Sequence, residues 1–353
     1  MEIPFRRTVT EGMKYDVTIG IPVYKSEAYI RQALESALAQ TYPSIEFLIV
    51  DDGGGDTSGL ILQDIKKDHC RGADIHIIMH SHNMGVSASR NQIIEEAQGV
   101  FLYFMDSDDV IAENTIDLLM QKIREFDAEI AFGSYEKIEL DGSRIVCQYQ
   151  SQSLIGEDLL ALYAYRKFAG IQASACNFMV RTSLLRNNHL RFVNSSYWED
   201  FVFTFDMVTY ISRAVLLSDI TYSYICREGS LSHYQKRKII SKNEVLQNIQ
   251  TVNYLKMTSI SLCHKVYYPN RCRNIVMTNF YIACNILKRR KDIVPSFSDE
   301  EIKGLMFHPA TFRQICLFRQ SFLINMLLYI IGKLPSKMCV LTIWCLGKVK
   351  KLV

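Results

Sequence analysis

The first part of the chain alternates between short apolar runs and stretches whose apolar residues recur with helical spacing. The runs have the length and composition of strands that are apolar on both faces, and they occupy residues 17–23, 45–50, 75–79 and 100–105. Amphipathic helical stretches separate them, as at residues 26–40 and 86–97. We therefore predict an α/β fold with a mostly parallel sheet flanked by helices.

After residue 132 the pattern changes. A hairpin is predicted over residues 135–149, around Asp141-Gly142, and a helix, a strand and a second helix follow at about 157–167, 175–180 and 198–208. Beyond about residue 240 the spacing is helical and no longer alternates with strands. The carboxyl-terminal part is therefore expected to be a helical region of its own.

Composition excludes several classes of protein. The 353 residues exceed what one core usually holds, and 48% apolar with 22% charged residues excludes a disordered chain. A net charge of +3 is too even for a general nucleic-acid binder. The ten cysteines contain no Cys-x-x-Cys pair, which argues against structural zinc, and the charged, non-apolar start is not a signal peptide. We therefore expect a cytoplasmic protein that does not bind nucleic acid.

Charge is unevenly distributed along the chain. Residues 302–353 contain eight basic residues and no acidic ones, whereas residues 1–301 contain 32 basic against 37 acidic residues, a net −5. The same tail contains two apolar runs, 322–331 and 338–346, each shorter than the ~20 residues that cross a bilayer. Two interpretations remain open: helices lying on an anionic membrane surface, and a helix pair that covers the core.

Acidic residues cluster where two of the predicted strands end. Asp106, Asp108 and Asp109 follow one strand and Asp51-Asp52 another. The carboxyl ends of parallel strands form one ligand-binding edge, so these clusters should converge on one crevice. Crowded carboxylates suit Mg²⁺ or Mn²⁺, which also bind phosphates, although a helix-capping turn and a solvated Gly-rich loop are alternative explanations.

Several short motifs follow one another in order over residues 16–125. They are Ile21-Pro22-Val23-Tyr24, Ser36 to Gln40, Val50-Asp51-Asp52-Gly53, Asp56-Thr57-Ser58, Asn83-Met84-Gly85-Val86-Ser87-Ala88-Ser89-Arg90-Asn91 and Asp106-Ser107-Asp108-Asp109. Together they resemble the amino-terminal signature of family 2 glycosyltransferases, although Gly54 stands where Ser is usual. The resemblance weakens over residues 130–235 and is absent beyond 240. It implies the GT-A fold, a nucleotide-sugar-binding sheet joined to an acceptor-binding half.

The resemblance also implies which residues bind the nucleotide-sugar donor. Tyr24 would stack on the base beside Pro22, and Asp52 would accept the ring N–H of uracil, which favours a UDP-sugar. Asp106 would reach the ribose or the donor sugar. The remaining donor-binding positions that it implies are Asn83, Gly85, Arg90, Ser107, Arg227, Ser230 and Ser232.

A divalent cation is part of the same implication. Asp108, with Asp106, would hold Mn²⁺ or Mg²⁺ against the diphosphate, where the cation neutralises the leaving group. His233 would complete the metal shell from the loop that follows a predicted strand at residues 221–226.

The general base comes from a later segment. An inverting transfer needs a carboxylate that removes the proton of the acceptor hydroxyl, and Glu199-Asp200 resembles the family's acidic pair, with Asp200 at the position of the base. The alternative is that both acids merely favour a helix start through its dipole. Trp198 is expected to form a wall for a sugar ring or part of the core.

From the resemblance we expect a metal-dependent inverting glycosyltransferase, of the hexosyl or N-acetylhexosaminyl type, that acts in cell-surface polysaccharide synthesis. The acceptor would be a saccharide or a lipid-linked oligosaccharide, at the cytoplasmic face of the membrane. A nucleotidyltransferase that makes sugar nucleotides and a catalytically inactive GT-A scaffold are the alternatives. The expected domains are an N-terminal extension (1–15), a nucleotide-sugar-binding half (16–132), an acceptor-binding and catalytic half (133–240) and a helical region (241–353) with a membrane-surface tail from about residue 320.

Overall fold

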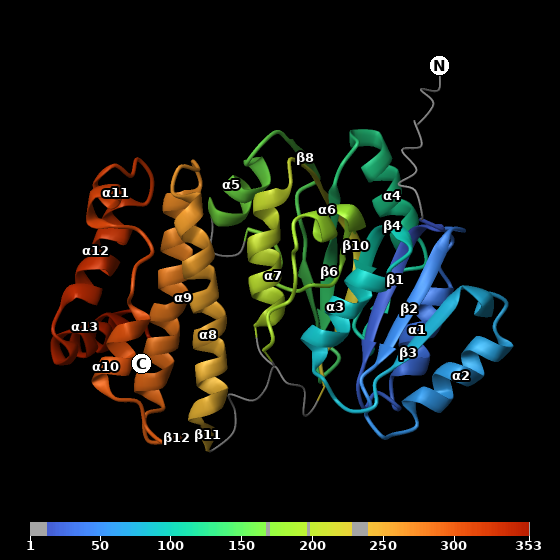
Figure 1. Ribbon diagram of the computed structural model, residues 1–353, viewed down its shortest axis with the longest axis horizontal. Coiled ribbons are helices and arrows are strands. Elements are labelled where there is room, and N and C mark those ends of the chain that lie inside the picture. The colour runs from blue at the N-terminus through green and yellow to red at the C-terminus, as the bar shows by residue number, and fades with distance from the viewer. Residues whose placement is uncertain (1–12, 167–169, 196–197, 228–238, 353) are drawn as a thin grey trace. The chain divides into compact units, whose positions relative to one another are not determined.

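Figure 1 shows the computed structural model, which describes residues 13–166, 170–195, 198–227 and 239–352. The chain divides into two compact units, the first formed by residues 1–160 and 173–228 and the second by residues 161–172 and 229–353. The domain boundaries expected at residues 132 and 240 stay predictions.

The first unit is an α/β structure in which the predicted strands form. Its strands are β1 (Tyr15–Val23), β2 (Ile45–Asp51), β3 (Ile75–Met79), β4 (Gly99–Phe104), β5 (Val110–Ile111), β6 (Ile130–Ile138), β7 (Arg144–Cys147), β8 (Gln152–Ile155), β9 (Phe178–Arg181) and β10 (Arg213–Ile225). Its helices are α1 (Ile30–Leu38), α2 (Ser58–Asp68), α3 (Val86–Glu96), α4 (Thr115–Phe126), α6 (Thr182–Asn187) and α7 (Glu199–Met207), with 3₁₀ turns at Gly72–Asp74 and Val208–Tyr210. Helix α5 (Leu159–Arg166) begins in this unit and continues in the second.

One sheet joins all ten strands in the order β3-β2-β1-β4-β9-β6-β10-β5, with β7 beside β6 and β8 beside β10. Strands β1 to β4 are mutually parallel, as expected from runs that are apolar on both faces. The other half is mixed: β9 runs antiparallel to β4 and β6, whereas β10 runs parallel to β6. The predicted hairpin is formed by β6 and β7. Helix α3 packs against β1 and β2, and α4 against β6 and β10. This confirms the predicted α/β class.

The register of the parallel half aligns the ends of its strands. Val23 pairs with Asp51, and Asp51 pairs with Met79, so β1, β2 and β3 end together. Strand β4 lies on the other side of β1 and ends at Phe104, opposite Gly20. The polar residues that follow these strands therefore line one edge of the sheet.

The second unit is helical, as expected. Its elements are α8 (Lys242–Ser259), a 3₁₀ turn (Ile260–Leu262), α9 (Tyr268–Lys288), α10 (Asp299–Leu305), α11 (Phe312–Cys316), α12 (Phe322–Lys333) and α13 (Ser336–Val349), with the short parallel strands β11 (Ile240–Ser241) and β12 (Ile293–Val294). Capping boxes start α8, α10 and α11, at Ser241, Ser298 and Thr311. Among the described residues, none of the helices combines the length and the apolar character that crossing a membrane requires.

Candidate active site

The loop after β2 is fixed by a buried carboxylate. Asp52 is 2% exposed and accepts hydrogen bonds from the backbone N–H groups of Met84 and Gly85, each at 2.8 Å, and from Nδ1 of His80 at 2.7 Å. Gly85 has a φ of +93°, which its lack of a Cβ permits. Asp52 therefore holds the turn that leads into α3, where the sequence places Asn83 and Gly85 for the donor.

His80, to which the sequence assigned no role, lies between two acceptors. Its Nδ1 faces Asp52, and its Nε2 is 2.6 Å from Oε1 of Gln92. Burial lowers the pKa of His80, but the hydrogen bonds to Asp52 and Gln92 outweigh it and leave the pKa above its usual value. Nothing in the spacing of the sequence points to this contact.

Arg90 joins the two acidic segments that the sequence placed at the site. It lies on α3, is 5% exposed and donates from one guanidinium nitrogen to Asp106 and from another to Glu199, each at 2.9 Å. Asp106 follows β4 and Glu199 opens α7. The structure therefore brings the donor-side residues and the predicted catalytic segment together, through a buried cation.

Asp200 lies beside this pair and has an elevated pKa. Burial, followed by the charge of Glu199, raises the pKa of Asp200 to about 7, although Arg90 opposes the shift. The backbone N–H of Phe201 donates to Asp200 at 2.6 Å. Trp198, with a φ of 64°, precedes the helix, and its ring makes an edge contact with Phe201.

The turn after β4 contains three carboxylates in different surroundings. The side chain of Asp108 is 41% exposed and lies 3.6 Å from Arg227, while partial desolvation and the neighbouring Asp106 raise its pKa to about 6. Asp109 is 1% exposed and accepts from Oη of Tyr222 at 2.6 Å and from the N–H of Ile225 at 2.8 Å. Asp109 therefore ties the turn to β10, whereas Asp106 and Asp108 stay partly open to solvent.

Three other predicted residues also lie at this edge. The hydroxyl of Ser107 is 2.7 Å from that of Ser26, which links the turn after β4 to the loop after β1. Pro22 is buried in β1 opposite Val50, and Tyr24, just after β1, is 44% exposed. The loops after β1 and β4 therefore meet at this edge, whereas the convergence of Asp51-Asp52 with the cluster at Asp106, Asp108 and Asp109 stays a prediction.

Arg227 reaches the same edge from the end of β10. Its guanidinium carbon lies 3.4 Å from the ring centroid of Tyr29, and its Nη1 is buried without a hydrogen-bond partner among the described residues. Ser230, Ser232 and His233 lie outside the described residues.

Asp106 and Asp108 have the type of ligand atom that a divalent cation prefers. Their arrangement provides only two such side chains among the described residues. Asp106 and Asp108 supply hard oxygen atoms. Burial, followed by the charge of Asp106, raises the pKa of Asp108, and a bound cation would favour its ionised form. The described residues contain no group of three or more His, Cys, Asp or Glu side chains arranged to hold a metal. Among the described side chains, Asp106 and Asp108 are therefore the ones that would hold a cation, with its remaining positions open to substrate oxygen atoms or water.

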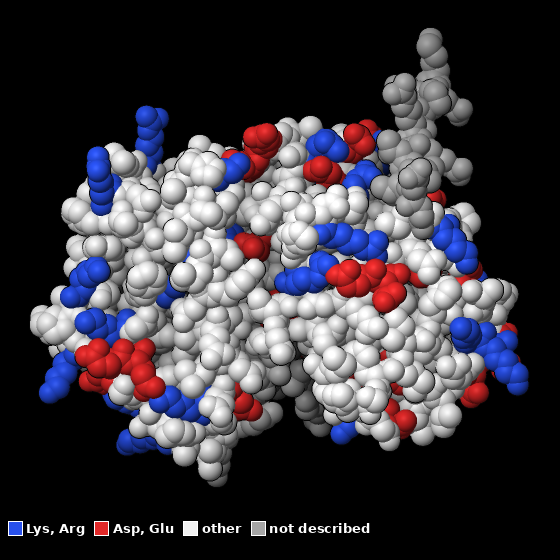
Figure 2. Space-filling model, in the orientation of Figure 1, with Lys and Arg blue, Asp and Glu red and all other residues white. Residues whose placement is uncertain are grey.

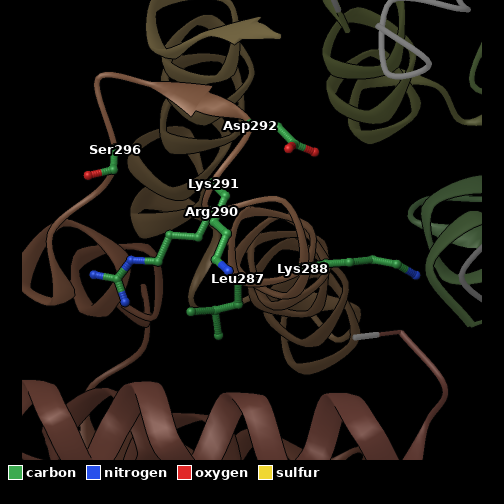
Figure 3. Close-up of a pocket in the computed structure, with 6 residues that line it drawn as sticks. All are labelled: Leu287, Lys288, Arg290, Lys291, Asp292 and Ser296. Atoms are coloured by element: carbon green, nitrogen blue, oxygen red, sulfur yellow. The ribbon is translucent and has the colours of Figure 1, made fainter. Parts of the chain in front are cut away.

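A hollow of about 590 Å³ lies in the second unit and shares no residue with this edge. Figure 3 shows its lining, formed by Leu287, Lys288, Arg290, Lys291, Asp292 and Ser296. Arg290 donates to the carbonyl of Phe297 and to Asp299, at 2.9 and 2.8 Å, so its charge is already satisfied. We assign the hollow no function.

The α/β sheet with acidic residues at one edge agrees with the GT-A fold that the sequence predicts. The family model described as glycosyl transferase family 2 matches residues 18–187. Over these residues, a little under half of the chain, the sequence is similar to glycosyl transferase family 2.

Relatives and a solved structure agree with this similarity. Glycosyltransferase GlyA of Streptococcus pneumoniae is 30% identical over 63% of this chain and 32% of its own length. The teichoic acid poly(glycerol phosphate) polymerase of Staphylococcus epidermidis is 26% identical over 59% of this chain and 28% of its own length. The chain thus spans about a third or less of either relative. The crystal structure of S. aureus TarS 1–349 in complex with UDP-GlcNAc has a TM-score of 0.63 at 18% identity, over 90% of both chains, and so shares the fold.

Proposed function

We propose that the protein transfers a hexosyl or N-acetylhexosaminyl group from a UDP-sugar, with inversion, to a saccharide or lipid-linked oligosaccharide in cell-surface polysaccharide synthesis. The observation that supports this most is Arg90, which connects Asp106 on the donor side with Glu199, next to Asp200. A relative named as a teichoic acid polymerase and a structural neighbour solved with UDP-GlcNAc support the polysaccharide and the donor.

The donor would be held by groups that can still form further hydrogen bonds or stacking contacts. Nη1 of Arg227 is buried, lies 3.6 Å from Asp108 and makes no hydrogen bond among the described residues. It suits a diphosphate, because a guanidinium N–H forms strong charge-assisted hydrogen bonds to phosphate oxygen atoms. The exposed ring of Tyr24 offers a face for the base. A carboxylate has about four acceptor sites, and the three hydrogen bonds to Asp52 leave one for a uracil N–H.

Asp200 is the proposed general base. In an inverting transfer the acceptor hydroxyl attacks the anomeric carbon opposite the departing UDP and gives its proton to the base. A pKa of about 7 suits this task, because a base is most efficient when its pKa lies near the working pH. Glu199 would not move a proton; paired with Arg90, it would keep Asp200 in a negative environment.

Asp106 and Asp108 are the proposed cation ligands. When bound, Mn²⁺ or Mg²⁺ would neutralise charge on the diphosphate leaving group. Asp106 is also the partner of Arg90, so the ligand and the base segment would be linked through one guanidinium.

Release of UDP from a panel of UDP-sugars, with and without saccharide acceptors, tests the proposal. Asp200→Asn should reduce transfer by about 10²-fold or more while donor affinity stays nearly unchanged, as for a lost general base. The wild-type rate should rise with pH through about 7 and then level off, because Asp200 must be ionised to accept a proton. Asp219→Asn, an exposed carboxylate of β10, is the matched control and should have no effect. Equal losses of donor binding and rate in Asp200→Asn would make Asp200 a structural residue, and no turnover with any donor would favour an inactive scaffold.

Calorimetric UDP binding tests the cation. Chelation should weaken binding, and Asp108→Asn should weaken the cation dependence by about tenfold or more, the scale of a disturbed metal site. Asp219→Asn again provides the control. UDP affinity that does not respond to a chelator would contradict the metal proposal while leaving the transferase proposal intact.

A further inference from the structure

The last two helices of the second unit bury only narrow stripes of their surfaces. On α12 the buried residues are Asn325, Leu328 and Ile331, and on α13 they are Cys339, Ile343 and Gly347. Both helices pack against α9, against α10 and against each other, and α12 also packs against α11. Each helix therefore buries about one residue per turn, and the rest of its surface is at least partly exposed.

The outward sides of both helices are nevertheless apolar. On α12, Leu323, Leu327 and Ile330 are 80%, 47% and 49% exposed, and they follow one another at helical spacing. On α13, Met338, Leu341 and Trp344 are 54%, 59% and 38% exposed. A surface helix of a globular unit normally exposes polar residues there, and large exposed apolar surfaces mark interaction sites.

Basic residues surround this apolar surface. The described lysines of the two helices and of the segments next to them are Lys333, Lys337, Lys348, Lys350 and Lys351, and residues 302–353 contain no acidic residue. In Figure 2 the basic residues over α11 and α12 are dispersed among uncharged ones. Two aromatic rings lie under lysines: Tyr329 with Lys333 at 5.2 Å and Trp344 with Lys348 at 3.8 Å. Aromatic rings beside lysines are typical of surfaces that meet the lipid headgroup region.

The nearest acidic residues in the sequence lie on α10 and are largely engaged. Asp299 pairs with Arg290 at 2.8 Å and Glu301 with Lys242 at 2.6 Å. Glu300 accepts a hydrogen bond from the hydroxyl of Ser336 at the start of α13. Glu300 keeps its negative charge beside α13, whereas α12 and α13 themselves contain lysines and no acidic residue, so the two helices are positively charged.

We propose that the outward face of α12 and α13, defined by Leu323, Leu327, Ile330, Met338, Leu341 and Trp344, binds the surface of an anionic lipid bilayer. The apolar side chains enter the headgroup boundary and the lysines contact anionic headgroups, without any helix crossing the bilayer. A second copy of the chain is the less favourable partner, because two such faces would bring like charges together. This binding goes beyond the proposed function and does not depend on the identity of donor or acceptor.

Flotation of the full chain with lipid vesicles tests the proposal. The protein should float with vesicles of equal parts phosphatidylglycerol and phosphatidylcholine, and far less with phosphatidylcholine alone. Raised salt should weaken the binding, since it screens exposed charges. Lys337→Glu and Lys348→Glu should each weaken binding to the anionic vesicles about fivefold or more, while Lys67→Glu on α2 should not.

Apolar substitutions separate insertion from charge attraction alone. Leu323→Ser and Leu341→Ser should each reduce binding about tenfold, because each removes one large side chain from the lipid boundary. Val266→Ser, which is 65% exposed in the same unit but outside α12 and α13, is the matched control. Circular dichroism spectra and melting temperatures should match the wild type, because these side chains face solvent. If the serine variants misfold, the lysine variants test membrane binding on their own.

Three results would overturn the proposal. The first is no preference for phosphatidylglycerol. The second is lysine and leucine variants that float as well as the wild type. The third is a concentration-dependent oligomer that Leu323→Ser dissociates, which would assign the face to a contact between copies of the chain.

Discussion

Buried cations lie in both units, and Arg90 of the first unit and Lys256 of the second have different partners. Arg90 in the first unit is 5% exposed and donates to the carboxylates of Asp106 and Glu199. Lys256 in the second unit is 1% exposed and donates to the carbonyl of Leu305 at 2.6 Å. The described residues show no salt bridge to Lys256. Burial opposes both charges, but the carboxylates keep the pKa of Arg90 above its usual value, whereas burial lowers the pKa of Lys256 to about 7.

Arg90 is a buried charge that the proposed chemistry uses. Lys256 is a buried charge without a carboxylate partner among the described residues, and its burial lowers the stability of the fold. A buried ion pair is a weak source of net stability, but removing one partner leaves the other charge buried and alone. Arg90 is therefore hard to replace, because two acidic residues of the proposed site depend on it. No described carboxylate relies on Lys256, so replacing it by an uncharged residue should remove the free-energy cost of burying its charge.

The largest effect is expected from Arg90→Met. The substitution leaves Asp106 and Glu199 without their cation, so the free energy of unfolding should fall by about 3–5 kcal/mol in urea titrations. Transfer should also fall, because Asp106 and Glu199 lose their common anchor.

Arg31→Met is the control for this substitution. Arg31 pairs with Glu35 at 3.8 Å on the surface of α1, with both side chains more than half exposed, and such pairs contribute at most about 1 kcal/mol. If the two variants unfold at the same urea concentration, the buried bridge contributes no more than a surface ion pair.

Much of the first unit was predictable from local sequence. Strands β1, β2, β3 and β4 are short apolar runs, and a parallel sheet with aligned strand ends follows from such runs separated by helices. The acidic residues at those ends were therefore predictable by position. The resemblance located Glu199 and Asp200 at the start of α7.

The contacts between side chains were not predictable in the same way. Arg90 and Glu199 are 109 positions apart, and no local pattern reports which of several carboxylates a guanidinium will meet. The same holds for Asp109, whose partner Tyr222 lies 113 positions away on β10. The sequence did not show which side of α12 is exposed, because its apolar run indicated either core or membrane surface. The folded structure shows that Leu328 is buried and Leu323 is exposed.

The smaller effect, with the opposite sign, is expected from Lys256→Met. The pKa of Lys256 is about 7 in the folded chain and about 10.4 in an unfolded one, so between these values the unfolded chain binds more protons. The free energy of unfolding of the wild type should therefore rise with pH between the two pKa values. The rise should be about 2 kcal/mol between pH 7 and pH 9, because the unfolded chain binds more protons than the folded one over this range.

Methionine fills a similar volume without a charge, so the variant should be more stable than the wild type near pH 7, by about 1–2 kcal/mol. This net figure includes the loss of the hydrogen bond to the carbonyl of Leu305. The advantage should fade toward pH 9, because the wild-type lysine is then already neutral in the folded state. Lys67→Met, an exposed lysine of α2, controls for the loss of a lysine elsewhere and should show no such pH-dependent difference. Urea titrations of the three proteins across this pH range measure the effect. A Lys256→Met variant that is less stable than the wild type at pH 7 would mean that the hydrogen bond to Leu305 outweighs the burial of the charge, and that the two buried cations are alike after all.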